Sequence, residues 1–361
     1  MADCSTISEN SEKSSENRRA EHPLATGTDG LRDRFGRLHE SLRISVTDRC
    51  NIRCFYCMPA GPISFLPRDE ILSYEEIARV VDIAARLGLR KLRITGGEPL
   101  VRAEVWELIS RLRKNRRIEE IALTTNGMLL AEQAEPLRRA GLDRLNISLD
   151  TLREEVFERI SRRKGLDRVL EGITAARAAG FDRIRLNALS IRGLTEDDIV
   201  PLADYALGHG MELRFIEFMP LDAEEGWASE QVLSGAEVRR VIEAAFGALV
   251  PAPRSVASQP AVDYMLKDRP GRIGFINPVS APFCGACDRL RLTAEGQIRN
   301  CLFSTTEWDV RKFLRTQDEG AEQASAIARQ FTHAVEAKKA GHGIDSPEFL
   351  RPERAMYQIG G

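Results

Sequence analysis

The chain has 361 residues, of which 43% are hydrophobic and 29% are charged, so it is long enough to bury a large core in one or two domains. Its formal net charge of −2 excludes a bulk positive field that would attract nucleic acid or a membrane surface. It has neither an apolar run of the roughly 18–20 residues that a transmembrane helix needs nor an N-terminal signal pattern, and we therefore expect a cytoplasmic protein.

Residues 1–30 are rich in Ser, Glu, Asn and Arg, which predicts a disordered leader. From about Leu42, β-like runs alternate with helix-like segments that carry an apolar residue every three or four positions. The β-like runs are 43–47, 91–95, 121–125, 144–149, 183–189 and 212–217. The helix-like segments are 74–87, 105–113, 130–140, 166–179 and 198–207. This α/β alternation predicts parallel strands joined by right-handed crossovers, with the active site at the carboxyl ends of the strands.

After about Met219 the alternation stops, and Pro and Gly become frequent. Strand-like pieces follow at 262–266, 272–276, 290–292 and 297–299. We interpret residues 31–218 as the core of the fold, 219–340 as a smaller C-terminal segment that caps it, and 341–361 as a mobile tail ending in two glycines.

Three cysteines, Cys50, Cys54 and Cys57, lie within eight residues directly after the first β-like run. As thiolates they can bind three irons of a cubane iron–sulfur cluster, which normally takes four cysteines. The missing fourth thiol would leave one iron open to a small molecule. The alternatives are a structural zinc site or buried structural cysteines. Zinc usually takes four ligands, commonly as two pairs, and no histidine lies near enough in sequence to complete the set.

A second set consists of Cys284, Cys287 and Cys301, so that of seven cysteines only Cys4 stands apart. An odd number in two tight groups argues against a secreted disulfide framework. Three thiols again predict a [4Fe-4S] cluster with one open iron. The alternative is one structural zinc site that takes a ligand from elsewhere in the chain.

Pairs of cationic residues alternate along predicted strands, so the members of each pair share a face. The pairs are Lys91 with Arg93, Arg183 with Arg185, and Arg289 with Arg291. An unpaired cation inside a barrel would cost several kcal/mol, and an anionic ligand such as a triphosphate would be its natural partner. The alternative is that these side chains face outward into water.

The spacing of Cys50, Cys54 and Cys57 resembles the signature of the radical S-adenosylmethionine (SAM) superfamily, which implies a partial (β/α)6 TIM-type barrel. In that superfamily the three cysteines hold a [4Fe-4S] cluster, and SAM chelates the fourth iron through its amino and carboxylate groups. An electron from the cluster then splits SAM into methionine and a 5′-deoxyadenosyl radical.

Further segments narrow the resemblance: residues 42–50 (LRISVTDRC), 93–100 (RITGGEPL), and 283–292 (FCGACDRLRL) followed by Cys301. From about Leu42 to the last residue the chain resembles the radical SAM enzymes that begin molybdenum cofactor biosynthesis, which carry a second cluster in a C-terminal segment. The resemblance implies conversion of GTP to (8S)-3′,8-cyclo-7,8-dihydroguanosine 5′-triphosphate. Hydrogen is taken from the ribose C3′, and the carbon radical attacks C8 of guanine. The implied cofactors are SAM and two [4Fe-4S] clusters.

The resemblance also implies roles for individual residues. The implied SAM-binding positions are Tyr56, Gly97, Glu98, Ser148 and Met219. The implied GTP-binding positions are Arg43, Arg93, Thr124, Arg185, Arg289, Leu290 and Arg291, with Arg185 in place of a lysine found in many relatives. The implied catalytic positions are Arg43, Lys91, Arg93, Arg214, Gly360 and Gly361. The cations would clamp phosphates or steady the radical intermediate, and the two glycines would reach into the active site.

The implied partners are a flavodoxin- or ferredoxin-like electron donor and the cyclic pyranopterin synthase that acts on the product, and a homodimer is left open. Two other functions compete. One is a radical SAM enzyme whose second cluster serves peptide or sugar modification. The other is a non-enzymatic iron–sulfur sensor or electron carrier, although such proteins normally ligate every iron with a protein side chain.

Overall fold

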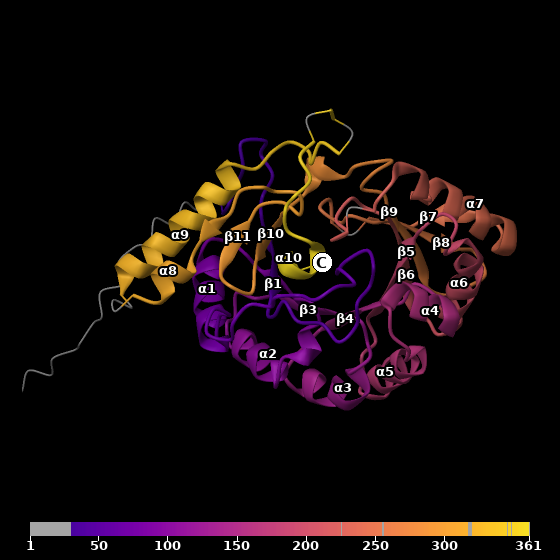
Figure 1. Ribbon diagram of the computed structural model, residues 1–361, viewed down its shortest axis with the longest axis horizontal. Helices are drawn as coiled ribbons and strands as arrows, with labels where there is room; N and C mark the ends of the chain where they lie inside the picture. Colours follow the sequence, from indigo (N-terminus) through magenta and orange to yellow (C-terminus); the bar gives the residue numbers. More distant parts are fainter. Residues whose placement is uncertain are drawn as a thin grey trace, which may run out of the picture.

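The computed structural model describes residues 30–360 except 225, 255, 317–319, 345 and 348, so nearly all of the predicted leader and Gly361 lie outside the described residues. A curved twelve-stranded sheet forms the wall of an open barrel, with helices around its outer face (Figure 1). Six strands lie side by side in chain order and run parallel. They are β1 (Ser41–Ser45), β2 (Lys91–Thr95), β3 (Glu120–Thr125), β4 (Arg144–Ser148), β5 (Ile184–Ser190) and β6 (Glu212–Glu217). The predicted (β/α)6 barrel is confirmed.

The five predicted helices are all present and form the outer layer of this barrel. They are α1 (Tyr74–Arg86), α2 (Val105–Arg113), α3 (Leu130–Arg139), α5 (Leu166–Ala178) and α6 (Ile199–Gly208). α1 begins with a capping box, in which Ser73 Oγ accepts from the amide of Glu76 and the Glu76 carboxylate accepts from the amide of Ser73. A sixth helix, α4 (Glu154–Ser161), lies between β4 and α5 and was missed, because it has only eight residues and no side-chain cap.

The C-terminal segment extends both edges of the barrel sheet. β9 (Arg272–Ile276) runs parallel to β6, and β10 (Arg289–Leu292) runs parallel to β1. The sheet continues beyond them with β8 (Val262–Leu266), β7 (Leu249–Pro251), β11 (Gln297–Arg299) and β12 (Trp308–Asp309). Its helices are α7 (Gly235–Phe246), α8 (Arg311–Leu314), α9 (Ala321–Glu336) and α10 (Met356–Ile359). Because β10 and β9 continue the barrel wall, the second cysteine set and the six-stranded core share one lumen.

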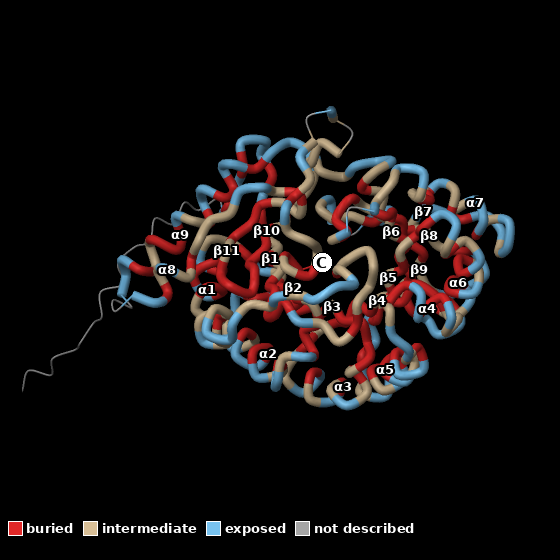
Figure 2. The backbone as a smooth tube through the Cα atoms, viewed as in Figure 1, coloured by how far each residue is buried: buried red, intermediate tan, exposed pale blue. Residues whose placement is uncertain are grey.

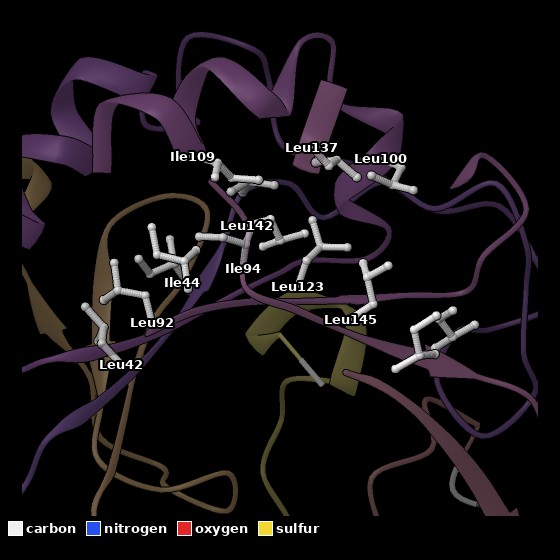
Figure 3. Close-up of a cluster of buried hydrophobic side chains, with 14 of the residues drawn as sticks. Leu42, Ile44, Leu92, Ile94, Leu100, Ile109, Leu123, Leu137, Leu142 and Leu145 are labelled. Carbon is white, nitrogen blue, oxygen red and sulfur yellow. The ribbon is translucent and has the colours of Figure 1, made fainter. Parts of the chain in front are cut away.

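The alternation along each strand separates an apolar outer face from a polar lumen. Leu42, Ile44, Leu92 and Ile94 are completely or almost completely buried and pack between the sheet and the helices (Figure 3). Burying one such side chain stabilises the fold by about 1.5–3 kcal/mol. The residues between them in sequence, such as Arg43 and Arg93, must therefore face the lumen.

The last described residues, which fall within the segment expected to be a mobile tail, form α10 in the barrel opening (Figure 1). Tyr357, Ile359 and Gly360 are buried there. Gly360 has a φ of +71°, and a Cβ at this position would lie 2.6 Å from Cγ2 of Thr95. Only glycine fits this position without a clash. Among the described helices, none is both long enough and apolar enough to cross a membrane.

Candidate active site

The lumen contains two adjacent cavities, of about 180 Å³ and 230 Å³, that share Arg43, Arg93, Arg214 and Arg289 in their linings. The first, here called the basic cavity, is also lined by residues at the amino ends of the strands, such as Lys91 and Arg144. The second, the cysteine cavity, is lined by residues at the carboxyl ends and by all three cysteines of the second set. The lumen thus has a strongly basic half and a half bordered by thiols.

The basic cavity has an excess of positive charge. Its lining includes eight cations but only two carboxylates, Glu120 and Asp288. The cations are Arg43, Lys91, Arg93, Arg144, Arg183, Arg185, Arg214 and Arg289. Such a concentration inside a chain of net charge −2 is unfavourable unless an anion compensates it. The expectation that the alternating cations share a lumen-facing surface agrees with this lining.

Several of these cations have acidic partners. Arg185 pairs with Glu212, and Arg144 donates to Glu120 over 2.7 Å. Arg214 lies 3.4 Å from Asp263 and 3.7 Å from Glu212, and Lys91 lies 3.7 Å from Glu40. Their charges are therefore partly neutralised by the protein itself.

Arg43, Arg93 and Arg289 differ from the other five cations, because none of the three has an ion pair within the described part of the chain. Burial, together with the positive charge of Arg289, lowers the pKa of Arg43 to about 10. Burial and the positive charges of Arg43 and Arg144 hold the pKa of Arg93 well below its usual value. Thr124 Oγ1, which lines the neighbouring cysteine cavity, is buried and has no hydrogen-bond partner among the described residues. Arg43 and Arg93 are suited to bind an anionic ligand in the lumen.

At the second cysteine set, Arg289 directs a guanidinium toward the thiols. Within the described part of the chain its Nε and Nη2 are buried and have no hydrogen-bond partner, and its guanidinium lies 5.0 Å from the ring centre of Phe283. Burial would raise the pKa of Cys287, but the positive charges of Arg289 and Lys338 lower it to about 7. These surroundings favour a thiolate, which is the form that binds iron.

Two buried cations, Lys338 and Arg37, bind backbone carbonyl groups around the second cysteine set. Lys338 Nζ donates to the carbonyl oxygens of Arg289 over 2.8 Å and Asn300 over 2.5 Å, and so ties the Cys287 side of the set to the Cys301 side. Arg37 Nη1 donates to the carbonyl oxygen of Cys284 over 2.7 Å. Two side chains from opposite ends of the chain therefore hold the backbone at Cys284 and close to Cys287 and Cys301.

The first cysteine set lies on the loop after β1, and a tight turn brings its members together. The amides of Cys57 and Met58 both donate to the carbonyl oxygen of Cys54 over 2.9 Å. Asn126 Nδ2 lies 3.7 Å from Cys50 Sγ. Burial and the charge of Glu98 raise the pKa of Cys50 to about 12.

Both cysteine sets have the donor atoms that an iron–sulfur cluster uses, since its irons are bound by cysteine thiolates. Among the described residues, no three His, Cys, Asp or Glu side chains converge closely enough to share one ion, as a zinc site requires. In a cubane cluster each cysteine binds a different iron, so its thiols stand further apart. The described cysteines are free thiols and form no disulfide.

The Gly-Gly-Glu-Pro turn after β2 packs against the loop that leads to the first cysteine set. A Cβ on Gly97 would lie 2.5 Å from the carbonyl oxygen of Arg49, and the Glu98 amide donates to that oxygen over 2.8 Å. The Glu98 carboxylate accepts hydrogen bonds from Thr125 Oγ1 and from the amides of Leu100 and Asn126. The turn therefore holds the cysteine loop in place. This structural role is separate from the SAM contact that the resemblance implies for the same turn.

The structure brings most of the expected site residues together. Tyr56, Ser148, Met219 and Arg291 line the cysteine cavity with Thr124 and Arg289. Leu290 differs, because its side chain is completely buried in the apolar layer outside the sheet. Gly97 and Glu98 lie beside the first cysteine loop rather than in either cavity lining.

Sequence reasoning missed several residues of the site. Asp150 accepts a hydrogen bond from the Tyr56 hydroxyl over 3.0 Å and from the amide of Leu189 over 2.7 Å. Asn187 lines the cysteine cavity, and Lys338 lies on the segment after α9. The alternation of β5 places Asn187 on the same face as Arg185, which was the signal available for it. Nothing in the sequence indicated Lys338.

Comparisons with known proteins agree with this geometry. The profile of the Radical SAM superfamily matches residues 44–206, and that of Molybdenum Cofactor Synthesis C matches residues 211–344. A GTP 3′,8-cyclase from Rhodopirellula baltica is 51% identical over 92% of either chain. A GTP 3′,8-cyclase from Paenarthrobacter nicotinovorans is 42% identical over 95% of this chain and 99% of its own.

The chain belongs to the GTP 3′,8-cyclase family. The resemblance noted from the sequence is thereby confirmed. A solved structure of Streptococcus suis SuiB bound to the precursor peptide SuiA has a TM-score of 0.59 and 14% identity, and covers 83% of this chain and 67% of that one. At this identity the likeness concerns the fold alone, and it agrees with the radical SAM barrel of the GTP 3′,8-cyclase family.

Proposed function

We propose that this protein is a radical SAM enzyme that converts GTP to (8S)-3′,8-cyclo-7,8-dihydroguanosine 5′-triphosphate, the first step of molybdenum cofactor biosynthesis. The observation that carries the proposal is the pair Arg43 and Arg93, which are half-buried, line the lumen and have no acidic partner among the described residues. Both line the basic cavity and the cysteine cavity, so a ligand that pairs with them borders on the thiols. A nucleoside triphosphate has the charge and the length for this position.

The two halves of the lumen support one orientation of GTP. The triphosphate would lie toward the basic cavity, where Arg43, Lys91 and Arg93 supply cations. The guanine would lie in the cysteine cavity near Arg289 and Arg291. Anchoring both ends of the nucleotide restricts the ribose between them, which is how an enzyme holds C3′ and C8 in a reactive geometry.

The cofactors of this proposal are SAM and two [4Fe-4S] clusters. Cys50, Cys54 and Cys57 would hold the first cluster, which with bound SAM supplies the radical that takes hydrogen from C3′. Cys284, Cys287 and Cys301 would hold the second. Tyr56, Ser148 and Met219 line the cavity beside the first cysteine loop and would contact SAM. α10 covers this space and would exclude water from the reacting atoms.

We further propose that the protein acts in the cytoplasm, receives its electron from a flavodoxin- or ferredoxin-like protein, and passes its product to cyclic pyranopterin synthase. A homodimer stays a prediction.

The decisive experiment is anaerobic reconstitution with iron and sulfide, followed by GTP, SAM and dithionite. We expect about eight irons per chain and the formation of 5′-deoxyadenosine together with a cyclised nucleotide. ATP in place of GTP is the control. SAM cleavage that does not depend on GTP would reject the proposed substrate, and about four irons would reject one of the two clusters.

A further inference from the structure

The first cysteine loop is bound directly to the carboxyl end of α4. The amide of Arg53 donates to the carbonyl oxygen of Ser161 over 2.8 Å, and the amide of Phe55 donates to that of Ile160 over 3.1 Å. These two amides flank Cys54. The carboxyl end of α4 is therefore hydrogen-bonded to the backbone on both sides of Cys54.

This end of α4 is strongly basic. Arg159, Arg162, Arg163 and Lys164 fall within six residues, and all except Arg162 are exposed (Figure 2). The loop that carries the first cysteine set adds two more cations. The guanidinium groups of Arg49 and Arg53 lie 5.5 Å and 5.2 Å from the ring centre of Phe65. We call these cations the basic rim: Arg49, Arg53, Arg159, Arg162, Arg163 and Lys164.

Few carboxylates neutralise the basic rim. Glu224 pairs with Arg162 over 2.7 Å, and Glu158 lies 3.8 Å from Lys164. The remaining four cations have no ion pair within the described residues, although the chain as a whole is slightly acidic. One or two cations at a helix carboxyl end are accounted for by the helix dipole, worth about 0.3–1 kcal/mol each. That effect does not account for Arg49 and Arg53, which come from another segment.

The position of the basic rim in the fold is a second observation, besides its charge. α4 lies between β4 and the crossover helix α5, so it belongs to the connections at the carboxyl ends of the strands, where the active site of such a barrel lies. The radical chemistry of the family requires one electron at the first cysteine set for each turnover. The lumen side of this set is bordered by the cysteine cavity, which Tyr56 lines, and by α10, so we expect the electron to arrive from the outer side.

We propose that the basic rim is the docking surface for a one-electron donor protein with an acidic face. The proposal rests on the radical SAM function proposed above. One electron passes from the reduced donor to the first cluster, so the donor is oxidised and the cluster reduced by one electron each, and no bond forms or breaks. Complementary charges accelerate such an encounter and make it sensitive to salt.

The test uses the reconstituted holoenzyme and the triple variant R159E/R163E/K164E, whose residues are exposed and touch neither cavity. The matched control is K114E/R116E/R117E, which reverses three exposed cations in the loop before β3, at the opposite end of the barrel. Formation of 5′-deoxyadenosine from SAM and GTP is measured with dithionite and, separately, with flavodoxin, its reductase and NADPH. The Kd of oxidised flavodoxin for each holoenzyme is measured by calorimetry at low and high salt.

We expect the rim variant to keep its dithionite-driven rate within twofold, while its KM and Kd for flavodoxin rise at least tenfold and lose their salt dependence. The control variant should match the wild type in every assay. An unchanged KM and Kd for flavodoxin in the rim variant would overturn the proposal, and so would binding of RNA to the rim in preference to flavodoxin. If the charge reversal impairs folding, the double variant R163Q/K164Q is used instead. Its KM and Kd for flavodoxin should rise about threefold. Wild-type enzyme inactive with dithionite would instead refute the proposed function.

Discussion

Arg291 Nη1 donates a hydrogen bond to the carbonyl oxygen of Gly360, and a second one, over 3.3 Å, to that of Ile359. Arg291 lies on β10, at the edge of the cysteine cavity. The end of the chain is thereby fixed to the same guanidinium that the resemblance assigns to GTP. Because an arginine has five donors, it can hold the tail and still reach a ligand.

The first prediction concerns this tail. Deletion of Gly360 and Gly361 should abolish cyclisation of GTP while both sets of cysteines still bind iron. Gly360→Ala should reduce turnover at least tenfold, because its Cβ would meet Thr95 and its φ of +71° is unfavourable for alanine. Product formation and iron content are the measurements, and extension of the chain by one glycine is the control. A truncated enzyme with full activity would contradict the role of the tail.

Arg93→Met provides the second prediction. It should raise the KM for GTP by about 10- to 100-fold, since a charge-assisted hydrogen bond is worth about 1.5–3 kcal/mol. The same variant should unfold at an equal or higher temperature without ligand, because it removes a half-buried cation that has no acidic partner among the described residues. Arg185→Met is the matched control, since Arg185 already pairs with Glu212 and its loss should lower the melting temperature. A normal KM for GTP in the Arg93→Met enzyme would show that Arg93 does not bind the phosphates.

The barrel could be predicted because its strands and crossover helices repeat a local pattern, and the cysteine sets could be recognised by their spacing. The pairing of strands that lie far apart in the sequence could not be predicted. That β10 pairs with β1, and β9 with β6, depends on contacts between residues more than fifty positions apart, for which the sequence has no local signal. For the same reason the contacts of Lys338 with Arg289 and Asn300 were not predictable. Leu290 was assigned to the site with its neighbours, although strand alternation turns its side chain away.

The third prediction concerns Lys338, which is almost fully buried beside the second cysteine set. Lys338→Gln can retain donors for the carbonyl oxygens of Arg289 and Asn300, but it removes the charge. We expect near-normal iron content and a more negative reduction potential for the second cluster, measured in a protein in which Cys50, Cys54 and Cys57 are replaced by alanine. Lys338→Met also leaves both carbonyl groups without this donor, at a cost of about 1–3 kcal/mol each, and should lose iron as well. Identical potentials in Lys338→Gln and the wild type would show that Lys338 only positions the backbone.

The fourth prediction is a pH dependence of stability at Asp33, which pairs with Arg37 behind Cys284. Burial opposes ionisation, but hydrogen bonds from His39 and Arg37 prevail and lower the pKa of Asp33 to about 2. Because the pKa is lower in the folded than in the unfolded chain, the ionised carboxylate stabilises the fold above about pH 4, and this stabilisation is lost as the pH falls toward 2. Asp33→Asn keeps an acceptor for the amides of Phe35 and Arg37 but not the charge. Its free energy of unfolding should be lower than that of the wild type by on the order of 1–2 kcal/mol at pH 7, and the difference should shrink between pH 4 and pH 2. Denaturant unfolding at several pH values measures this, and a difference that stays constant with pH would show that the charge of Asp33 does not contribute.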